Sequence, residues 1–130
     1  MPHRILLVED NPQNRYLVTF LLDKHGYTVD VAEDGEQALD MLASGPAPDL
    51  ILMDMQLPKI DGYEATRRIK ASETHKRIPL VALTAHSMKG DRDKALAAGC
   101  DEYVTKPVDA EGLVQLIGRL IAAQERSAGL

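Results

Sequence analysis

The stretch Leu50-Ile51-Leu52-Met53-Asp54-Met55-Gln56-Leu57-Pro58 begins with four apolar residues and then places a carboxylate, Asp54, at the fifth position. A short apolar run without alternation is typical of a strand that is buried on both faces, as in a parallel sheet. The strand predicted over residues 50–54 therefore ends on a charged side chain, and Leu57-Pro58 turns the chain soon afterwards. The segment predicts both a class of fold and the place where a polar site begins.

Four other short apolar runs are present, and each of the five is followed by a helical pattern. Strands are predicted over residues 5–8, 28–32, 50–54, 80–84 and 102–105. Helices are predicted from Pro12 to a stop at Gly26, from Asp34 to Ser44, up to about Ala71, from Met88 to Ala98, and from Ala110 to about Ala123. Residues 124–130 are expected to fray.

This alternation predicts an α/β fold with one five-stranded parallel sheet and helices on both of its faces. No repeat, low-complexity tract or linker interrupts the pattern, so we expect one domain over residues 1–125 and a short tail over residues 126–130. In sheets of this kind ligands bind beyond the carboxyl ends of the strands. That edge of the sheet is therefore where chemistry is expected.

The composition is that of an ordinary globular protein of 130 residues, with 45% hydrophobic and 27% charged residues. The net charge of −5 and the lack of a basic stripe argue against nucleic acid as a partner, so direct DNA binding is not expected.

Cys100 is the one cysteine, which excludes an internal disulfide, and we expect a small, partly buried thiol without a redox role. Neither a signal peptide nor a membrane-spanning run is evident, which predicts a cytoplasmic protein without membrane contact.

Polar residues occur where the predicted strands end. Glu9 and Asp10 follow the first strand, Asp54 ends the third, Thr84 ends the fourth, and Lys106 follows the fifth. The carboxyl ends of parallel strands meet at one edge, so the fold would bring these side chains together. Three carboxylates in one place repel each other, and a hard divalent cation such as Mg²⁺ removes that repulsion. No His or Cys falls at these positions, which argues against zinc.

Each of these residues also has an ordinary structural interpretation. Asp10 or Asp54 could cap a helix or a turn, Thr84 could be a plain strand end, and Lys106 could be a solvated lysine. What favours a functional site is that all of them fall at the correct ends of their strands.

The same segments resemble the receiver domain of two-component response regulators over essentially the whole chain. The matching segments are Ile5-Leu6-Leu7-Val8-Glu9-Asp10-Asn11, Asp49 to Pro58, Asp61-Gly62, Val81-Ala82-Leu83-Thr84-Ala85 and Tyr103-Val104-Thr105-Lys106-Pro107. Residues 82–91 also resemble stand-alone cell-cycle receivers of the DivK type, and receivers of hybrid histidine kinases carry the same motif. The resemblance implies a flavodoxin-like (βα)5 fold with strand order 2-1-3-4-5.

The resemblance also implies a role for each site residue. Asp54 would be the nucleophile that accepts a phosphoryl group, and carboxylates are known to serve in this way. Lys106 would pair with the phosphoryl group, and Thr84 would hydrogen-bond to it. Mg²⁺, with Mn²⁺ as the alternative ion, would be held by Glu9, Asp10, Asp54 and the backbone carbonyl of Gln56.

Tyr103 occupies the position of the aromatic switch residue in this family. The resemblance implies that Thr84 moves toward the phosphoryl group and that Tyr103 then turns inward. This movement would reshape the surface of the fourth helix, fifth strand and fifth helix, through which a downstream effector would bind. The alternative is that Tyr103 is an ordinary half-buried aromatic residue of a strand.

Gln56 and His86 each lie two residues beyond a predicted site residue and, by the resemblance, would flank the attacking water and set the lifetime of the phosphoryl group. His86 could equally be a solvated loop histidine. Ala85 leaves room for the phosphoryl oxygens. Pro107 permits a cis peptide bond after Lys106, which would aim the lysine inward.

Three functions within this family are considered. The first is a single-domain response regulator that takes phosphate from a histidine kinase or phosphotransfer protein onto Asp54 and acts by binding another protein. Such a protein catalyses only its own phosphorylation and dephosphorylation, so it is not an enzyme in the usual sense. The alternatives are a phosphorelay intermediate that passes phosphate to a histidine phosphotransfer protein, and the receiver domain of a hybrid kinase.

Two functions of other classes are weighed against these. A Mg²⁺-dependent phosphatase of the haloacid dehalogenase kind needs a second Asp two residues after the nucleophile, and Gln56 at that position cannot shuttle a proton. A flavodoxin-like module needs a phosphate-cradling loop after the first strand. The segment Glu9-Asp10-Asn11-Pro12 would instead repel the phosphate of FMN.

Overall fold

The computed structural model describes residues 3–57, 59–85, 89–106 and 108–128. The strands are β1 (Arg4–Val8), β2 (Thr28–Ala32), β3 (Leu50–Asp54), β4 (Leu80–Thr84) and β5 (Glu102–Thr105). The helices are α1 (Pro12–Lys24), α2 (Gly35–Ser44), α3 (Gly62–Ala71), α4 (Lys89–Ala98) and α5 (Ala110–Ala128). All strand pairs are parallel, and the strand order is β2-β1-β3-β4-β5, as expected from the sequence.

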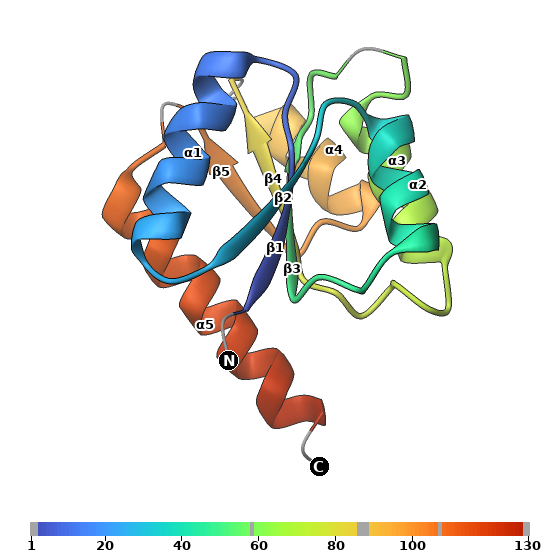
Figure 1. The fold of residues 1–130 in the computed structure, drawn as a ribbon. Helices are drawn as coiled ribbons and strands as arrows, with labels where there is room; N and C mark the ends of the chain where they lie inside the picture. The colour runs from blue at the N-terminus through green and yellow to red at the C-terminus, as the bar shows by residue number, and fades with distance from the viewer. Residues whose placement is uncertain (1–2, 58, 86–88, 107, 129–130) are drawn as a thin grey trace.

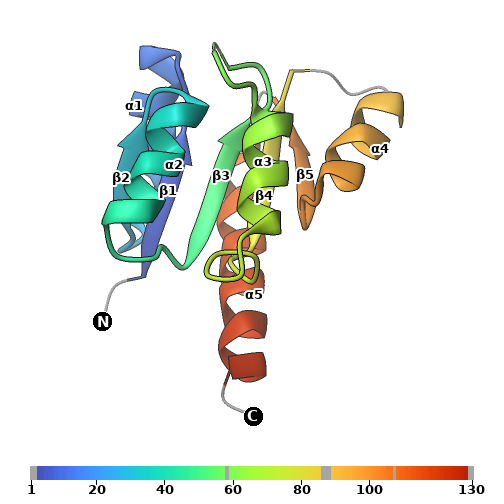
Figure 2. The same cartoon turned by 90° about the vertical axis from the view of Figure 1, so that its right-hand side faces the viewer.

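The helices form one layer on each face of the sheet. Figure 1 shows α1 and α5 on one face, with α2, α3 and α4 on the other. Figure 2 shows α2, α3 and α4 side by side in front of the strands. This three-layer arrangement buries the sheet on both sides, which is why the first four residues of both β3 and β4 are apolar.

Two hydrophobic cores result from the alternation of side chains along the strands. Ile5 and Leu7 of β1 point into the core beneath α1 and α5, together with Leu22 and Ile117. The intervening residues of β1 and β3, such as Leu6 and Ile51, point into the core beneath α2, α3 and α4. Successive residues of a strand face opposite sides of the sheet, so one apolar run serves both cores.

β3 lies at the centre of the sheet, and all five of its residues are buried. The ladder continues just beyond the carboxyl ends of the strands, where Glu9 N–H donates to Ala32, Met55 N–H to Leu83, and Lys106 N–H to Thr84. These backbone bonds, of 3.0, 2.9 and 2.7 Å, hold the first residues after three strands in fixed positions. The strand ends therefore form a rigid platform for side chains.

Three helices begin at this same edge, and each begins with a side chain that caps it. Asn11, Asp34 and Asp61 each accept a hydrogen bond from the backbone N–H three residues later. Such N-caps satisfy amide groups that the first helical turn leaves without partners. Pro12 occupies the first turn of α1, as predicted.

The junction between β3 and α3 is packed very closely. A Cβ atom added to Gly62 would collide with the carbonyl oxygen of Asp54 and would lie 2.6 Å from the Cα of Met55. Only a residue without a side chain fits there. Gly62 therefore lets the start of α3 lie directly on the end of β3.

The boundaries differ from the predicted ones mainly at the C-terminal helix. α5 continues to Ala128, so the prediction that it ends near Ala123 and frays afterwards was wrong. Charged residues in its last turns, which weakened the apolar pattern in the sequence, are compatible with a solvated helix end. The predicted turn at Pro58, the start of a helix at Met88 and the peptide bond before Pro107 lie outside the described residues.

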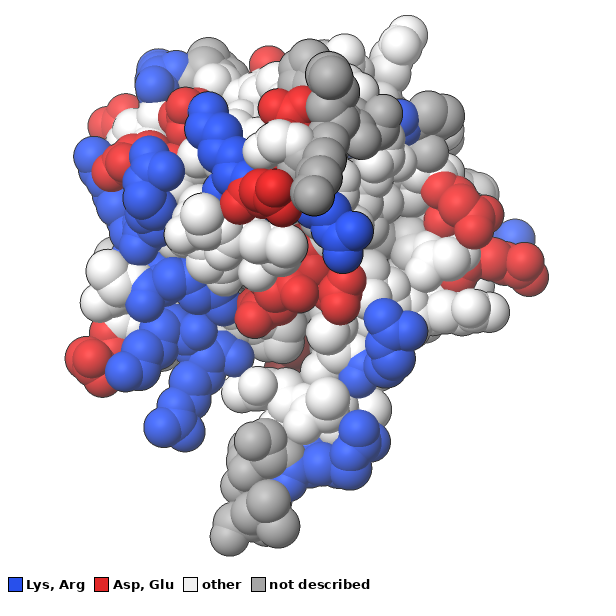
Figure 3. Space-filling view, turned by 180° about the vertical axis from the view of Figure 1, so that it is seen from behind, with Lys and Arg blue, Asp and Glu red and all other residues white. Residues whose placement is uncertain are grey.

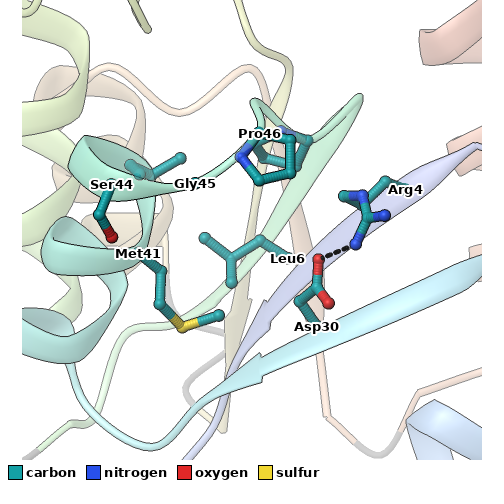
Figure 4. A pocket seen from close by; sticks show the side chains of 9 residues that line it. Arg4, Leu6, Asp30, Met41, Ser44, Gly45 and Pro46 are labelled. Carbon is teal, nitrogen blue, oxygen red and sulfur yellow. Dashed lines mark hydrogen bonds and ion pairs between the residues drawn. The ribbon is translucent and has the colours of Figure 1, made fainter.

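The two ends of the sheet differ in character. A pocket beside the end of α2 and the start of β1 is lined by apolar side chains such as Leu6 and Met41, with the Arg4–Asp30 ion pair at 2.6 Å (Figure 4). The polar residues predicted to carry chemistry do not line this pocket. They lie at the opposite, carboxyl edge of the strands.

Charged groups of both signs share the surface seen in Figure 3. Glu64 pairs with both Arg67 and Arg68, and Lys70 pairs with Asp101 at 2.9 Å. These basic side chains therefore have acidic partners. Within the described part of the chain, none of the helices combines the length and apolar character that crossing a membrane requires.

Candidate functional site

The site is built around Asp54, the last residue of the central strand. Its side chain is 2% exposed, and its Oδ2 lies 3.1 Å from the Nζ of Lys106. The same ammonium lies 2.9 Å from Oε1 of Glu9, which is 1% exposed. Lys106 therefore pairs with two buried carboxylates that come from the ends of β1 and β3. Burial of a charge is strongly unfavourable unless it is paired in this way.

Asp10 adds a third carboxylate on the solvent side. Oxygen atoms of Glu9, Asp10 and Asp54 all lie within 4.8 Å of one another, and Asp10 is exposed whereas the other two are buried. A cluster of hard oxygen donors, open to water on one side, fits the preference of Mg²⁺ for carboxylates and retained water ligands. The residues present could thus hold a divalent metal ion.

The electrostatics of the cluster agree with a site for a cation. Burial raises the pKa of Glu9, and the neighbouring Asp54 adds to this effect, whereas Lys106 opposes it. For Lys106, burial acts to lower the pKa, but the hydrogen bonds and charges of Glu9 and Asp54 outweigh it and raise the pKa. A single ammonium does not offset three carboxylates, so a further positive charge would stabilise their ionised forms.

Arg15 fixes the loop that carries two of these carboxylates. Its guanidinium donates to the backbone carbonyl of Glu9 at 3.2 Å and to that of Asp10 at 3.0 Å. It also forms an ion pair with Glu33 at 3.4 Å, which ties α1 to the segment after β2. The planar guanidinium suits such multiple contacts. Arg15 therefore positions the acidic residues without being one of them.

Gln56 connects the ends of β3 and β4. Its backbone N–H donates to Oδ1 of Asp54 at 2.9 Å. Its side-chain Nε2 donates to the hydroxyl oxygen of Thr84 at 3.3 Å, and its Oε1 accepts from the N–H of Ala85 at 3.4 Å. Thr84 is fully buried, whereas Gln56 and Ala85 are exposed. The side chain of Gln56 thus spans the gap beside the carboxylate of Asp54.

Tyr103 lies on β5, opposite Ala82 of β4 in the sheet register. It is half-buried and packs against the core beneath α2, α3 and α4. Its strand is at the edge of the sheet, and Tyr103 lies two residues before Thr105, which is paired with Thr84. His86, the other residue predicted to affect the phosphoryl group, lies outside the described residues.

Cys100 is 7% exposed and lies in the core beneath α3 and α4, away from the acidic cluster. Burial raises the pKa of its thiol to about 11. A thiol with such a pKa holds little of the reactive thiolate at neutral pH. It is more deeply buried than the sequence alone indicated.

The structure thus brings together Glu9, Asp10, Asp54 and Lys106, with Gln56 and Thr84 beside them, as the order of the strands predicted. Sequence reasoning missed the contacts of Arg15 and of the Gln56 side chain. Arg15 lies in the first turn of α1, five residues after Asp10, and a basic residue so close to the acidic pair is the signal that could have identified it.

Comparison with known proteins gives a consistent result. The chain matches the response regulator receiver domain family over residues 5–118. It is 39% identical over 117 residues to the polar-differentiation response regulator DivK of Brucella anthropi, covering 90% of this chain and 94% of that protein. It is 42% identical over 127 residues to the hybrid signal transduction histidine kinase I of Dictyostelium discoideum, covering 93% of this chain but 7% of the kinase.

Solved structures agree in fold. The receiver domain of the sensor histidine kinase PA1611 from Pseudomonas aeruginosa PAO1, with magnesium coordinated in its active-site cleft, is 42% identical with a TM-score of 0.87, covering 94% of this chain and 99% of that one. The chemotaxis protein CheY4 of Vibrio cholerae is 26% identical with a TM-score of 0.86, covering 92% and 99%.

Proposed function

Because the chain belongs to the response regulator receiver family, we propose that it accepts a phosphoryl group from a phosphohistidine onto Asp54 and signals by binding another protein in that state. The observation that carries this proposal is the single arrangement of a buried carboxylate at the end of β3, an ammonium 3.1 Å from it, and two further carboxylates beside it. Phosphoryl transfer needs an aligned nucleophile and positive charge around the transferred group, and little other machinery.

In the proposed step, a carboxylate oxygen of Asp54 attacks phosphorus and forms an O–P bond while the N–P bond of the donor phosphohistidine breaks. The leaving imidazole keeps the electron pair and takes a proton from water. Lys106, already beside Asp54, pairs with the transferred oxygens, and burial of the carboxylate strengthens this interaction. The chain itself then holds an aspartyl phosphate, which is hydrolysed in time.

Glu9, Asp10, Asp54 and the backbone carbonyl of Gln56 would hold Mg²⁺, with Mn²⁺ as the alternative. When bound, the ion supplies positive charge for the phosphoryl oxygens and keeps the acidic residues ionised. The donor set supports this assignment, since all three side chains offer carboxylate oxygens and no thiol or imidazole is among the ligands.

The partner that delivers phosphate would be a histidine kinase or a histidine phosphotransfer protein. An exposed apolar face on α1 supports docking close to the site: Tyr16, Leu17 and Phe20 are 68%, 63% and 61% exposed. A groove lined by Leu17, Val18 and Leu21 continues from this face to Glu9 and Lys106. Exposed apolar patches of this kind typically mark interaction sites.

The downstream effector would bind the surface formed by α4, β5 and α5. All four residues of β5 are partly exposed, and this strand pairs with β4 alone. The strand also carries Tyr103, so a change at Thr84 would reach this surface through the neighbouring strand. Direct DNA binding is not part of the proposal, given the net charge of −5 and the paired basic groups on the face described above.

DivK-type regulators support a stand-alone regulator as the first proposal, because the match covers 94% of such a protein. The hybrid kinases support the second, in which the chain passes phosphate to a histidine phosphotransfer protein. This chain spans 7% of one such kinase and 12% of histidine kinase 1 of Arabidopsis thaliana. Reversible transfer of the phosphoryl group between purified proteins would favour the relay, and phosphorylation-dependent binding of an effector would favour the regulator.

A cytoplasmic location of the protein stays a prediction.

The proposal is tested by labelling with acetyl phosphate in the presence of Mg²⁺. The natural protein is expected to gain one phosphoryl group by mass spectrometry, and the Asp54→Asn variant is expected to gain none. Asp49→Asn is a matched control, because Asp49 lies at the other end of β3, where its side chain accepts from the N–H of Arg4. Labelling of the Asp54→Asn variant at the natural rate would contradict the proposal.

A further inference from the structure

The side chain of Gln56 uses the same hydrogen-bonding groups that a phosphoryl group on Asp54 would need. The hydroxyl of Thr84 accepts from its Nε2 at 3.3 Å, and the N–H of Ala85 donates to its Oε1 at 3.4 Å. At the same time its backbone N–H is bound to Asp54 at 2.9 Å. One residue therefore contacts both the predicted acceptor of the phosphoryl group and the end of β4.

We infer that the Gln56 side chain acts as a latch: its two hydrogen bonds, to the Thr84 hydroxyl and to the Ala85 N–H, hold these groups in the unphosphorylated arrangement. Both hydrogen bonds must break before Thr84 and the Ala85 N–H can bind phosphoryl oxygens. This inference rests on the proposed function and assigns to the amide a positioning role, separate from the predicted role of the Gln56 backbone carbonyl toward a metal ion. Gln56 thus sets how readily the modified site engages the switch.

The inference follows from a competition for hydrogen-bonding groups between the Gln56 side chain and a phosphoryl group on Asp54. A phosphoryl group adds three strong acceptor oxygens, and it is stabilised by donors that point at it. The N–H of Ala85 cannot donate fully to a phosphoryl oxygen while it donates to Oε1 of Gln56. Thr84 cannot turn toward Asp54 without breaking its bond to Nε2. Both distances, 3.3 and 3.4 Å, exceed the usual N–H···O range of about 2.7–3.2 Å, so the two hydrogen bonds are weak enough to break when a phosphoryl group arrives.

The test compares beryllofluoride binding, at saturating Mg²⁺, between the natural protein and the Gln56→Met variant. Met has nearly the shape of Gln but makes neither amide bond, and residue 56 is exposed, so the fold should tolerate it. Loss of two weak neutral hydrogen bonds in the unmodified state is expected to tighten beryllofluoride binding on the order of fivefold. Gln56→Asn is too short to reach both partners and is expected to give an intermediate gain.

A second measurement separates positioning from a general structural effect. In the metal-bound variant without beryllofluoride, the Ala85 amide and Thr84 methyl NMR signals are expected to shift toward their positions in the beryllofluoride complex of the natural protein. Gln37→Met is the matched control, because the Gln37 side chain accepts from the backbone N–H of Glu33 and lies on α2, outside the acidic cluster. This control is expected to leave both readouts unchanged.

The inference is overturned if Gln56→Met binds beryllofluoride with the natural affinity or more weakly, or if the two NMR signals do not move. The proposed function fails in a different way. If the natural protein does not bind beryllofluoride at all, or if Asp54→Asn binds it equally well, then the assignment of Asp54 is wrong whatever Gln56 does.

Discussion

At the scale of single residues, the site is a set of unfavourable charges held in place by backbone structure. Asp54 and Glu9 are buried although both carry carboxylates, and one lysine bridges them at 3.1 and 2.9 Å. Such a cluster costs folding energy, because each charge leaves water. The cost is consistent with function, since residues with perturbed pKa values concentrate at sites that do chemistry.

Replacement of Arg15 by Ala is expected to weaken Mg²⁺ binding roughly tenfold, because residues that orient metal ligands have effects of this size. The guanidinium of Arg15 donates to the backbone carbonyls of Glu9 and Asp10 at 3.2 and 3.0 Å, and the side chains of these two residues are proposed metal ligands. Isothermal titration of Mg²⁺ into the purified protein measures the change. Arg15→Lys should recover part of the affinity.

The control for Arg15 is Arg4→Ala. Arg4 is the first residue of β1 and, like Arg15, forms an ion pair with an acidic side chain, here that of Asp30. This pair lies at the opposite end of the strands from the acidic cluster. Its loss should lower thermal stability without altering Mg²⁺ affinity. Equal affinities for Mg²⁺ in the Arg15→Ala and natural proteins would show that Arg15 has no positioning role.

The sequence identified the acidic cluster because Glu9, Asp54 and Lys106 lie at or just after the carboxyl ends of parallel strands, which meet at one edge of the sheet. No knowledge of side-chain packing is needed for that conclusion. The roles of Arg15 and of the Gln56 side chain could not be predicted in this way, because their hydrogen bonds reach backbone carbonyls, a backbone N–H and a hydroxyl on other segments. Such contacts depend on the turns of the loops and on rotamers, which leave no fixed spacing in the sequence.

At the scale of elements, the junction of β3 and α3 determines where Asp54 points. Gly62 begins α3 against the backbone of Asp54 and Met55, while Asp61 caps the same helix. Gly62 N–H also donates to the carbonyl of Met55 at 3.3 Å. This hydrogen bond ties the start of the helix to the residue that follows Asp54.

Gly62→Ala is expected to reduce the free energy of unfolding by roughly 1–3 kcal/mol, because the added methyl group must displace backbone atoms. It should also weaken Mg²⁺ binding by shifting the loop that carries Gln56. Denaturant unfolding and Mg²⁺ titration measure the two effects. Gly90→Ala on α4 is the control: nothing lies within 4 Å of its added Cβ, and helix propensity predicts a small gain in stability. Unchanged stability of Gly62→Ala would refute the close packing described for this junction.

The exposed face of α1 gives a prediction about the phosphate donor. Phe20→Ser should slow transfer from a phosphorylated histidine phosphotransfer protein by roughly tenfold, as for a central aromatic residue of an interface. Labelling by acetyl phosphate needs no protein surface and should proceed at the natural rate. Leu96→Ser on α4, where the side chain is 42% exposed, is the control for loss of an exposed apolar group. Equal transfer rates for the Phe20→Ser and natural proteins would exclude docking on this face.

Most elements were predictable, because short apolar runs and strong stop signals bound them. Residues 28–32, 50–54, 80–84 and 102–105 form strands with the predicted limits. The end of α5 was not predictable, since Gln124, Glu125 and Arg126 interrupt the apolar stripe. These residues are good helix formers, so the helix continues after its contact with the core has ended.

At the scale of the whole molecule, two neighbouring strands join the acidic site to the proposed effector surface. Thr84 ends β4, Tyr103 lies on β5, and the backbone of Lys106 is bonded to Thr84 at 2.7 Å. A phosphoryl group that draws Thr84 toward Asp54 would alter packing along this pair of strands. The fold therefore provides a short mechanical route from the site to its surface.

Binding of beryllofluoride with Mg²⁺ is expected to change the NMR signals of Thr84 and Tyr103 and of residues along α4, β5 and α5. Signals from α2, which packs against β2 and β1 near the other edge of the sheet, should change little. The Asp54→Asn protein under the same conditions is the control and should show no such change. If Thr84 and Tyr103 keep their signals in the natural protein, the proposed switch does not operate.

The position of β5 at the edge of the sheet has a consequence for hydrogen exchange. Every residue of β3 is buried and the strand pairs with both β1 and β4, whereas β5 is partly exposed and pairs with β4 at the edge of the sheet. Local opening should therefore require much less free energy in β5 than in β3, and its amides should exchange sooner. The proposed chemistry would thus take place on a strand that opens rarely, and its result would be read on a strand that opens more easily.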